Sequence, residues 1–173
     1  PDGLITTATY NYGIGFTIGT QHVLTSTSGA GLATALTSAT YFDGLGRSLK
    51  KESTGPDAKI IVTEVQYDSR GAVRKKSLAY FKTLESVTGR WATTSYDALG
   101  RVVRMDSPDS TRGLACFADW VTVTIDAADH RKRETKDAYG RTVRVDEYQS
   151  TTSTCDTAVG TPYATTTYQY DVQ

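Results

Sequence analysis

Carboxylate and cationic side chains recur in this chain in a fixed order, and they are the residues whose types could do chemistry. In each case an aspartate is followed three residues later by glycine, or once by a second aspartate, and arginine, alanine or histidine comes next. Several carboxylates that converge on one point can bind a metal ion or act as acids and bases. The tetrads begin at Asp43, Asp68, Asp97, Asp126 and Asp137, and a further one starts at Asp171.

The spacing of these aspartates favours turns over a metal or catalytic site. Successive aspartates are 25, 29, 29, 11 and 34 residues apart. Asp at the first position and Gly at the fourth are favoured in a type I turn, and Gly adopts the left-handed conformation without steric cost. A type I turn followed by left-handed Gly is a common β-hairpin connection with a bulge. Asp126 and Asp129 are close together, but a Ca²⁺ loop needs more oxygen ligands. Each tetrad therefore predicts a hairpin tip.

The tetrads belong to a longer phrase in which tyrosine precedes the aspartate and arginine follows the glycine. Alternating residues place Tyr67 on the strand face of Val65, and Arg141 on the face of Val143. We expect the arginine stem to pack on this more apolar face and its head to meet a ring or a carboxylate. The residues of the repeated phrase are Tyr41, Asp43, Gly46, Arg47, Tyr67, Asp68, Gly71, Tyr96, Asp97, Gly100, Arg101, Asp126, Asp129, Asp137, Gly140, Arg141, Tyr170 and Asp171.

The segments between the tips have the two-residue period of β-strands. No segment shows an amphipathic helical period. Residues 26–40 are small and polar and predict a loop or a poorly patterned strand, with room for one helical turn at 30–36. The fold class expected is all-β: an antiparallel meander of hairpins in a curved sheet. Two strands are expected within 1–25, and others near 47–53, 59–67, 72–80, 90–96, 101–106, 119–125, 131–136, 141–148 and 163–170.

Composition argues against several function classes. The chain has 19 acidic and 19 basic residues, so no global field attracts nucleic acid or an anionic membrane. Hydrophobic residues make up 38% of the chain, which is typical of a sheet with one solvated face. No apolar run reaches transmembrane length, and no signal peptide is visible. We expect no enzyme activity, cofactor or metal.

Two cysteines and two histidines offer little chemistry. Cys116 and Cys155 are too few for a disulfide framework or a zinc site. A disulfide between them would typically add ~2–4 kcal/mol, but unpaired cysteines are the favoured interpretation. His22 and His130 are the only histidines, and a general-base role for His130 is disfavoured because no nucleophile or orienting partner is identifiable.

The phrases at 41–47, 96–101 and 137–141 resemble the RHS or YD-repeat family, most closely the repeats of the B component of bacterial Tc toxins. The resemblance covers about 40–173 and, more weakly, 1–39, and both ends look like cuts through a longer array. Departures are Ala72 in place of arginine, Lys136 in place of tyrosine, and the degenerate unit at Asp126.

The resemblance implies a hollow β-shell that encloses and delivers a C-terminal toxic domain, in a secreted or cell-surface protein. The partners implied are neighbouring repeats of the same chain and the enclosed toxin domain or a toxin-complex subunit. The alternative function is a carbohydrate- or protein-binding surface of the adhesion type. Trp91 and Trp120 are the candidate glycan platform, although packing within the sheet explains them equally well.

Overall fold

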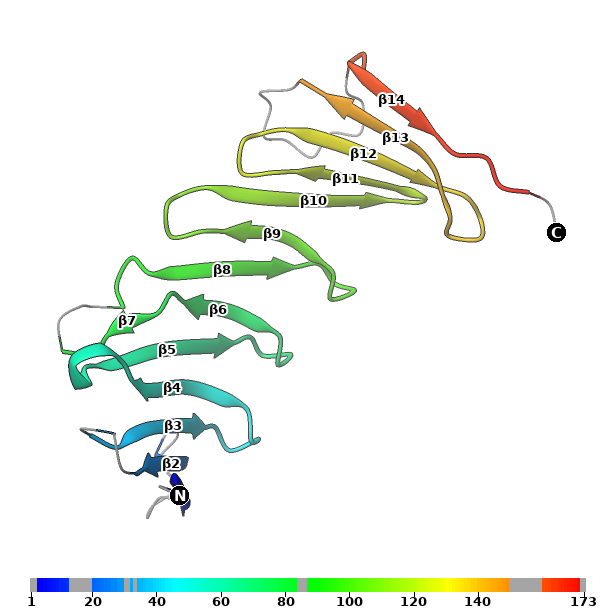
Figure 1. Ribbon diagram of the computed structural model, residues 1–173. Helices are drawn as coiled ribbons and strands as arrows, with labels where there is room; N and C mark the ends of the chain where they lie inside the picture. The colour runs from blue at the N-terminus through cyan, green and yellow to red at the C-terminus, as the bar shows by residue number, and fades with distance from the viewer. Residues whose placement is uncertain are drawn as a thin grey trace. The chain divides into compact units, whose positions relative to one another are not determined.

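The protein is all-β in a computed structural model that describes residues 3–12, 20–29, 32, 34–83, 87–149 and 160–171. Its strands form an antiparallel meander, and the only helical element among these residues is a three-residue 3₁₀ turn, Pro56–Ala58. The sheet is open, with β1 and β14 as its edge strands. Figure 1 shows the meander from β2 to β14. The chain divides into two compact units, residues 1–92 and 93–173, which are described separately below.

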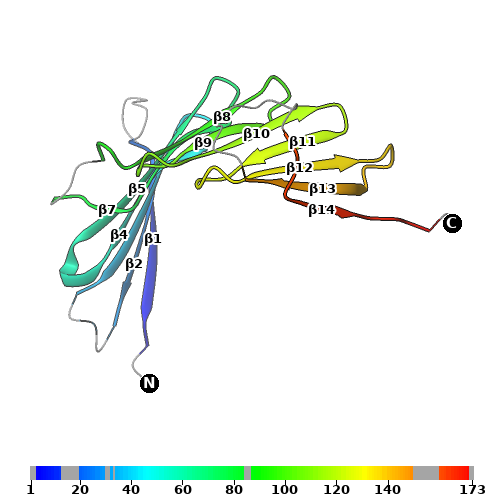
Figure 2. The same cartoon turned by 90° about the horizontal axis from the view of Figure 1, so that it is seen from above.

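The first unit is built from strands that pair in chain order. A short additional strand, β7 (Tyr80–Phe81), pairs with β5. The strands twist progressively, as Figure 2 shows when the unit is seen from above. The remaining strands of this unit are β1 (Ile5–Asn11), β2 (His22–Ser28), β3 (Leu36–Phe42), β4 (Ser48–Thr54), β5 (Ile60–Tyr67) and β6 (Val73–Ser77).

The second unit repeats the same meander. It begins within β8 (Trp91–Tyr96), and each strand pairs with the next along the chain. The strands that follow are β9 (Val102–Asp106), β10 (Arg112–Ala118), β11 (Val121–Ile125), β12 (Arg131–Lys136), β13 (Thr142–Tyr148) and β14 (Ala164–Thr167).

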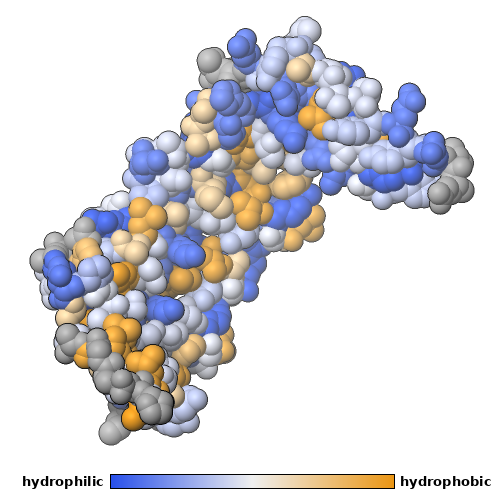
Figure 3. All heavy atoms as spheres, viewed as in Figure 1, coloured by the Kyte–Doolittle hydropathy of each residue, from blue (hydrophilic) through white to orange (hydrophobic). Residues whose placement is uncertain are grey.

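Few side chains are fully buried, as expected for sheets without a second layer. Val62 is buried in the first unit, and Val123 and Ile125 are buried in the second. The second unit also buries Asp146, whose carboxylate accepts hydrogen bonds from Arg144 and from the Thr165 hydroxyl. On the face seen in Figure 3, hydrophilic and hydrophobic residues are mixed along the strands.

The all-β antiparallel meander predicted from the sequence is confirmed, with one local difference. Strand β10, Arg112–Ala118, was not expected, because its small residues lack a clear alternation. At both ends of 26–40 the alternative of a poorly patterned strand is confirmed, since β2 continues to Ser28 and β3 begins at Leu36. Much of the helical turn expected at 30–36 lies outside the described residues.

The favoured interpretation of unpaired cysteines is wrong for Cys116. Cys116 is disulfide-bonded, and no described cysteine is free. The chain's other cysteine, Cys155, lies outside the described residues. Spacing in the sequence could not reveal the pairing, because the meander decides which positions far apart in the chain lie close together.

Candidate functional site

The candidate site is the set of hairpin tips formed by the aspartate tetrads. At the β3–β4 tip, Asp43 Oδ1 accepts hydrogen bonds from the backbone N–H groups of Leu45 and Arg47, both 2.9 Å long. The Gly46 N–H donates to the Asp43 carbonyl at 3.0 Å. The same two Oδ1 contacts, each 2.9 Å, recur at Asp68, Asp97, Asp126 and Asp137.

The fourth residue of every tetrad is in the left-handed region. Its φ is +77° at Gly46, +85° at Gly71, +80° at Gly100 and +78° at Gly140. At the remaining tip the residue is Asp129, with φ +60°. The strand register shifts beside four of the five tips, which is the bulge expected after such a turn.

The second carboxylate oxygen binds the cation that follows the tetrad. Asp43 Oδ2 lies 2.7 Å from Arg47 Nε, and the Asp97–Arg101 pair has the same distance. Asp137 and Arg141 are 2.8 Å apart. At the Asp126 tip, the Nδ1 atom of His130 takes this place at 3.1 Å. Each tip with arginine therefore neutralises its own charge.

Hydrogen bonding keeps these aspartates ionised. Partial desolvation raises the pKa of Asp43, Asp97 and Asp137, but hydrogen bonds from the backbone and guanidinium of the following arginine outweigh it. The pKa of each therefore lies below the ordinary value. At Asp68 and Asp126, the backbone N–H four residues on is the largest cause of the lowered pKa.

Each of these arginines also covers an aromatic ring on the neighbouring strand. Arg47 Cζ lies 4.5 Å from the centroid of the Tyr67 ring, Arg101 Cζ lies 4.0 Å from Phe117, and Arg141 Cζ lies 4.6 Å from Tyr170. In each case the arginine directly precedes one strand. Tyr67 and Phe117 lie at or next to the end of the following strand, and Tyr170 lies three residues beyond β14. We call this aspartate–arginine–ring arrangement the clasp.

Two of the clasps have an additional hydrogen bond from the tyrosine. The Tyr67 hydroxyl donates to the Ser48 carbonyl at 2.8 Å, and the Tyr170 hydroxyl donates to the Thr142 carbonyl at 2.7 Å. Both acceptors are the residue directly after the clasp arginine. The tyrosine of one phrase therefore binds the arginine segment of an earlier phrase and joins two hairpins.

Some phrase residues do not take part as expected. Phe42, not Tyr41, directly precedes Asp43, and the Tyr41 ring instead contacts Lys50 Nζ at 4.0 Å. Ala72 leaves the second tip without a clasp arginine, and Arg70 reaches Asp68 at 3.5 Å instead. Tyr96 is the last residue of β8. Asp171 is the last residue that the structure describes.

Sequence reasoning predicted a turn at 108–110 but did not group it with the tetrads, and it did not single out Phe117. Ser107 begins a turn with the same backbone bonds, since its N–H donates to Thr111 and its carbonyl accepts from Ser110. Ser110 has φ +70°, so it occupies the glycine place. Phe117 was also missed, because no aspartate follows it directly. An aromatic residue near the end of the strand after a clasp arginine was the signal available.

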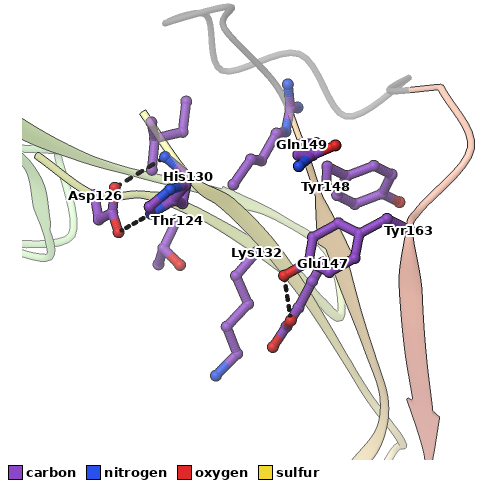
Figure 4. Close-up of a pocket in the computed structure, with 10 residues that line it drawn as sticks. Thr124, Asp126, His130, Lys132, Glu147, Tyr148, Gln149 and Tyr163 are labelled. Atoms are coloured by element: carbon purple, nitrogen blue, oxygen red, sulfur yellow. Dashed lines mark hydrogen bonds and ion pairs between the residues drawn. The ribbon is translucent and has the colours of Figure 1, made fainter. Parts of the chain in front are cut away.

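A pocket of about 610 Å³ lies on the second unit, beside the Asp126 tip. Figure 4 shows Lys132, Glu147 and Tyr163 among the side chains that line it. The Tyr163 hydroxyl donates to Glu147 at 2.8 Å, and this hydrogen bond raises the pKa of Tyr163. His130 is exposed at the rim and paired with Asp126. The hydroxyl side chains among the described lining residues are those of Thr124, Tyr148 and Tyr163.

The two tryptophans are placed differently. Trp91 is half-buried at the start of β8 in the first unit, whereas Trp120 is 57% exposed on the β10–β11 turn of the second. Within the described part of the chain, no group of three or more metal-ligating side chains converges. No helix there has the length and hydropathy to cross a membrane.

Solved structures with a similar fold are complexes of Tc toxin components. The chain matches TcdB2-TccC3-Cdc42 with a TM-score of 0.63 and 18% identity, and TcdB2-TccC3-TEV with 0.68 and 20%. It matches the Photorhabdus luminescens Tc holotoxin pore, in a TccC3 mutant, with 0.61 and 18%. The chain shares the fold of these Tc toxin chains. The resemblance to the RHS or YD-repeat family is thereby confirmed at the level of the fold.

The match covers most of this protein but only a small part of each Tc toxin chain. It covers 88% of this chain but only 9% of each Tc toxin chain. No protein-family model and no curated protein matches the sequence.

Proposed function

We propose that this protein is a structural, non-catalytic segment of an RHS/YD-repeat shell that encloses and protects a toxin cargo. The observation that carries the proposal is the clasp. Arg47, Arg101 and Arg141 each hold the ring of a neighbouring strand. All the contacts of a clasp are made within the sheet, so its residues are used to build a wall.

The clasps suit a wall because the same contact can join each further hairpin to the sheet. Each one joins neighbouring hairpins, so stability accumulates along the array, as in other repeat proteins. The glycine bulges at the tips twist and bend the strands beside them. The similarity to Tc toxin chains supports this role, since two of those structures contain TcdB2 together with TccC3.

The partners and location follow from the same proposal. The segment contacts neighbouring repeats of a longer chain, and the enclosed surface faces a C-terminal toxin domain or a toxin-complex subunit. The complete protein acts outside the cell, secreted or on the bacterial surface. A structural shell segment of this kind requires no cofactor, no metal ion and no insertion of the segment into a membrane.

Protease protection tests the shell. In the full-length polypeptide that carries this segment, the C-terminal domain should resist proteinase K until denaturant unfolds the array. The double variant Arg141→Ala/Tyr170→Ala removes one clasp, so cargo cleavage should begin at lower denaturant concentration. Tyr168→Ala is the matched control, because Tyr168 is 45% exposed and outside the clasp. A cargo cut equally fast in native and denatured protein contradicts the proposal.

A second candidate, a carbohydrate- or protein-binding surface, is favoured by Trp120. Its exposed ring borders a pocket of about 490 Å³ that also contains Asp119, Arg133 and Lys136. An exposed indole beside hydrogen-bonding side chains suits a sugar ring. Glycan-array binding by the protein that is lost in Trp120→Ala or Trp91→Ala supports this candidate, and the absence of binding by the unmodified protein counts against it.

A further inference from the structure

One pocket of the second unit combines an exposed aromatic ring with side chains of both charges. Its volume is about 490 Å³, and it lies between the β10–β11 turn and the second half of β12. The turn contributes Asp119 and Trp120, and β12 contributes Arg133, Thr135 and Lys136. The volume is within the range of ligand pockets, roughly 300–1,000 Å³. We call this site the Trp120 pocket.

Backbone pairing brings the lining residues of the Trp120 pocket together. Val121 pairs with Thr135 across β11 and β12, and the Lys136 N–H donates to the Trp120 carbonyl at 2.8 Å. Arg133 and Thr135 are two residues apart on one strand, so they project from the same face of the sheet. The pocket is therefore shaped by the strand register, and its side chains are not needed to hold it together.

The turn does not require the side chains of Asp119 and Trp120. Asp119 has φ +48°, a conformation that glycine adopts without steric cost. Unlike the aspartates of the tetrads, Asp119 forms no hydrogen bond through its carboxylate within the described part of the chain. The Trp120 ring is more than half exposed. Both side chains are therefore available to a ligand.

The Trp120 pocket has an excess of positive charge. Arg133 and Lys136 supply two cations, whereas Asp119 supplies one carboxylate. Asp146 is the cross-strand neighbour of Arg133, but both of its oxygens already accept hydrogen bonds from Arg144 Nε, at 2.8 and 2.9 Å. One buried carboxylate thus lies beside two guanidinium groups and does not offset the excess.

Neither cation of the pocket is fully satisfied by the described residues. Arg133 Nε is buried and has no hydrogen-bond acceptor among them. Because that atom is enclosed, the terminal nitrogens of Arg133 are the ones left for a ligand. Lys136 is exposed and forms no ion pair in the described part of the chain, since the adjoining Asp137 is bound by Arg141. A carboxylate in the pocket would give both cations a strong, charge-assisted partner.

The lining also indicates what carries that carboxylate. The flat face of an indole suits the apolar face of a sugar ring, and the Asp119 carboxylate can accept hydrogen bonds from sugar hydroxyls. A phosphate dianion would be repelled by the same carboxylate. A single aromatic side chain buries roughly 150–250 Å², whereas a stable protein–protein complex buries about 1,200 Å² or more. A small ligand therefore fits better than a protein.

We infer that the Trp120 pocket binds a saccharide unit that carries a carboxylate, such as a uronic acid. The sugar ring lies on Trp120, its carboxylate interacts with Arg133 and Lys136, and a hydroxyl donates to Asp119. This inference rests on the second candidate function, the carbohydrate-binding surface, and names the class of carbohydrate. It does not depend on the enclosure of a cargo.

Two sugars that differ in a single group test the inference. Methyl glucuronide has a carboxylate where methyl glucoside has a hydroxymethyl group. Saturation-transfer NMR titrations with the full-length polypeptide should show that the glucuronide binds about tenfold more tightly at low ionic strength. The difference should shrink in about 0.5 M NaCl, because salt screens the exposed charges. Equal affinities would overturn the inference, and so would tighter binding of glucose 6-phosphate than of the glucuronide.

Three variants assign the binding to the pocket. Trp120→Ala should abolish binding of both sugars, whereas Lys136→Gln should reduce only the preference for the glucuronide. Leu99→Ala is the matched control, because Leu99 is an exposed apolar residue on another hairpin tip of the unit and lies outside the pocket. Glucuronide binding that persists in Trp120→Ala would place the site elsewhere and contradict the inference.

The inference and the proposed functions can fail separately. Equal binding of the two sugars that is lost in Trp120→Ala retains the carbohydrate-binding surface and overturns its preference for acidic units. Absence of binding by either sugar overturns both the inference and the second candidate function. The shell is judged by protease protection of the cargo, which neither result changes.

Discussion

Arg141 lies over the ring of Tyr170, with its guanidinium carbon 4.6 Å from the ring centroid, although 29 residues separate the two in the sequence. The Asp137 carboxylate holds the same guanidinium at 2.8 Å, and the Tyr170 hydroxyl bonds the Thr142 carbonyl. One side chain therefore closes its own turn and joins that turn to the next strand. The arrangement supports several expected outcomes.

Phe117→Tyr should stabilise the protein. Phe117 lies under Arg101 as Tyr67 lies under Arg47, but it has no hydroxyl to reach the residue after its arginine. By analogy with Tyr67 and Ser48, the new hydroxyl should bond the Val102 carbonyl. We expect a gain of about 0.5–1.5 kcal/mol in the free energy of unfolding, measured in urea. Phe117→Leu, which removes the ring, should be less stable than the parent; a Tyr variant no more stable than the parent contradicts the geometry.

Arg47 and Tyr67 should be energetically coupled. A double-mutant cycle with Arg47→Ala and Tyr67→Leu should give a coupling free energy of about 0.5–1 kcal/mol from cation–π contact. Arg47→Lys should recover only part of it, because an ammonium cannot stack on the ring and bind Asp43 as a planar guanidinium does. Additive effects in chemical denaturation would show that the clasp contributes nothing.

Gly100→Ala should destabilise the β8–β9 tip. Gly100 has φ +80°, a conformation that costs a residue with a Cβ roughly 1–2 kcal/mol. Gly44→Ala is the matched control, because Gly44 lies in a tip, has no positive φ and has nothing within 4 Å of an added Cβ. Thermal unfolding should separate the two variants clearly. A similar loss in both would show that the positive φ of Gly100 does not set the cost.

Acid should weaken the tips. The pKa values of Asp43, Asp97 and Asp137 are lower in the folded protein than the ordinary value of 3.8. Their contribution to stability is therefore complete above that value and is lost as the pH falls from it through the folded pKa. Unfolding free energy should be flat near neutral pH and should fall below about pH 4.

The carboxylates can be tested individually. Asp97→Asn should lower the free energy of unfolding at pH 7. It should also make the fall of this free energy in acid smaller, because an amide at position 97 does not titrate. Asp57→Asn is the control, since the Asp57 side chain is 80% exposed and lies outside the tetrads. An unchanged acid profile in Asp97→Asn would assign the decline to other groups.

The sequence was a good guide to local structure. Asp and Gly at fixed spacing determine the turn by short-range sterics and hydrogen bonds, so the tips at Asp43 and Asp97 were predictable. Strand β10 was not, because Gly113, Ala115 and Cys116 give no alternation of large apolar and polar residues. The expectation that the arginine head meets a ring or a carboxylate is confirmed at Arg47, which meets both.

The partner ring of each clasp could not be read from the sequence alone. Phe117 becomes the partner of Arg101 only when β9 pairs with β10 in the observed register. The pairing of Cys116 and the pocket beside Tyr163 likewise depend on which strands become neighbours. Long-range neighbours follow from the order and register of the whole meander, and no local pattern encodes them.

The interval between Asp126 and Asp137 contains a single strand, β12, so these two tips emerge at opposite ends. In a meander, removing one strand reverses the direction of every strand after it and exchanges the two ends. Duplications or deletions of whole strand pairs preserve the side on which later tips emerge. Such a protein should lengthen or shorten through evolution in even steps, and an odd step should survive only where a second odd step follows closely.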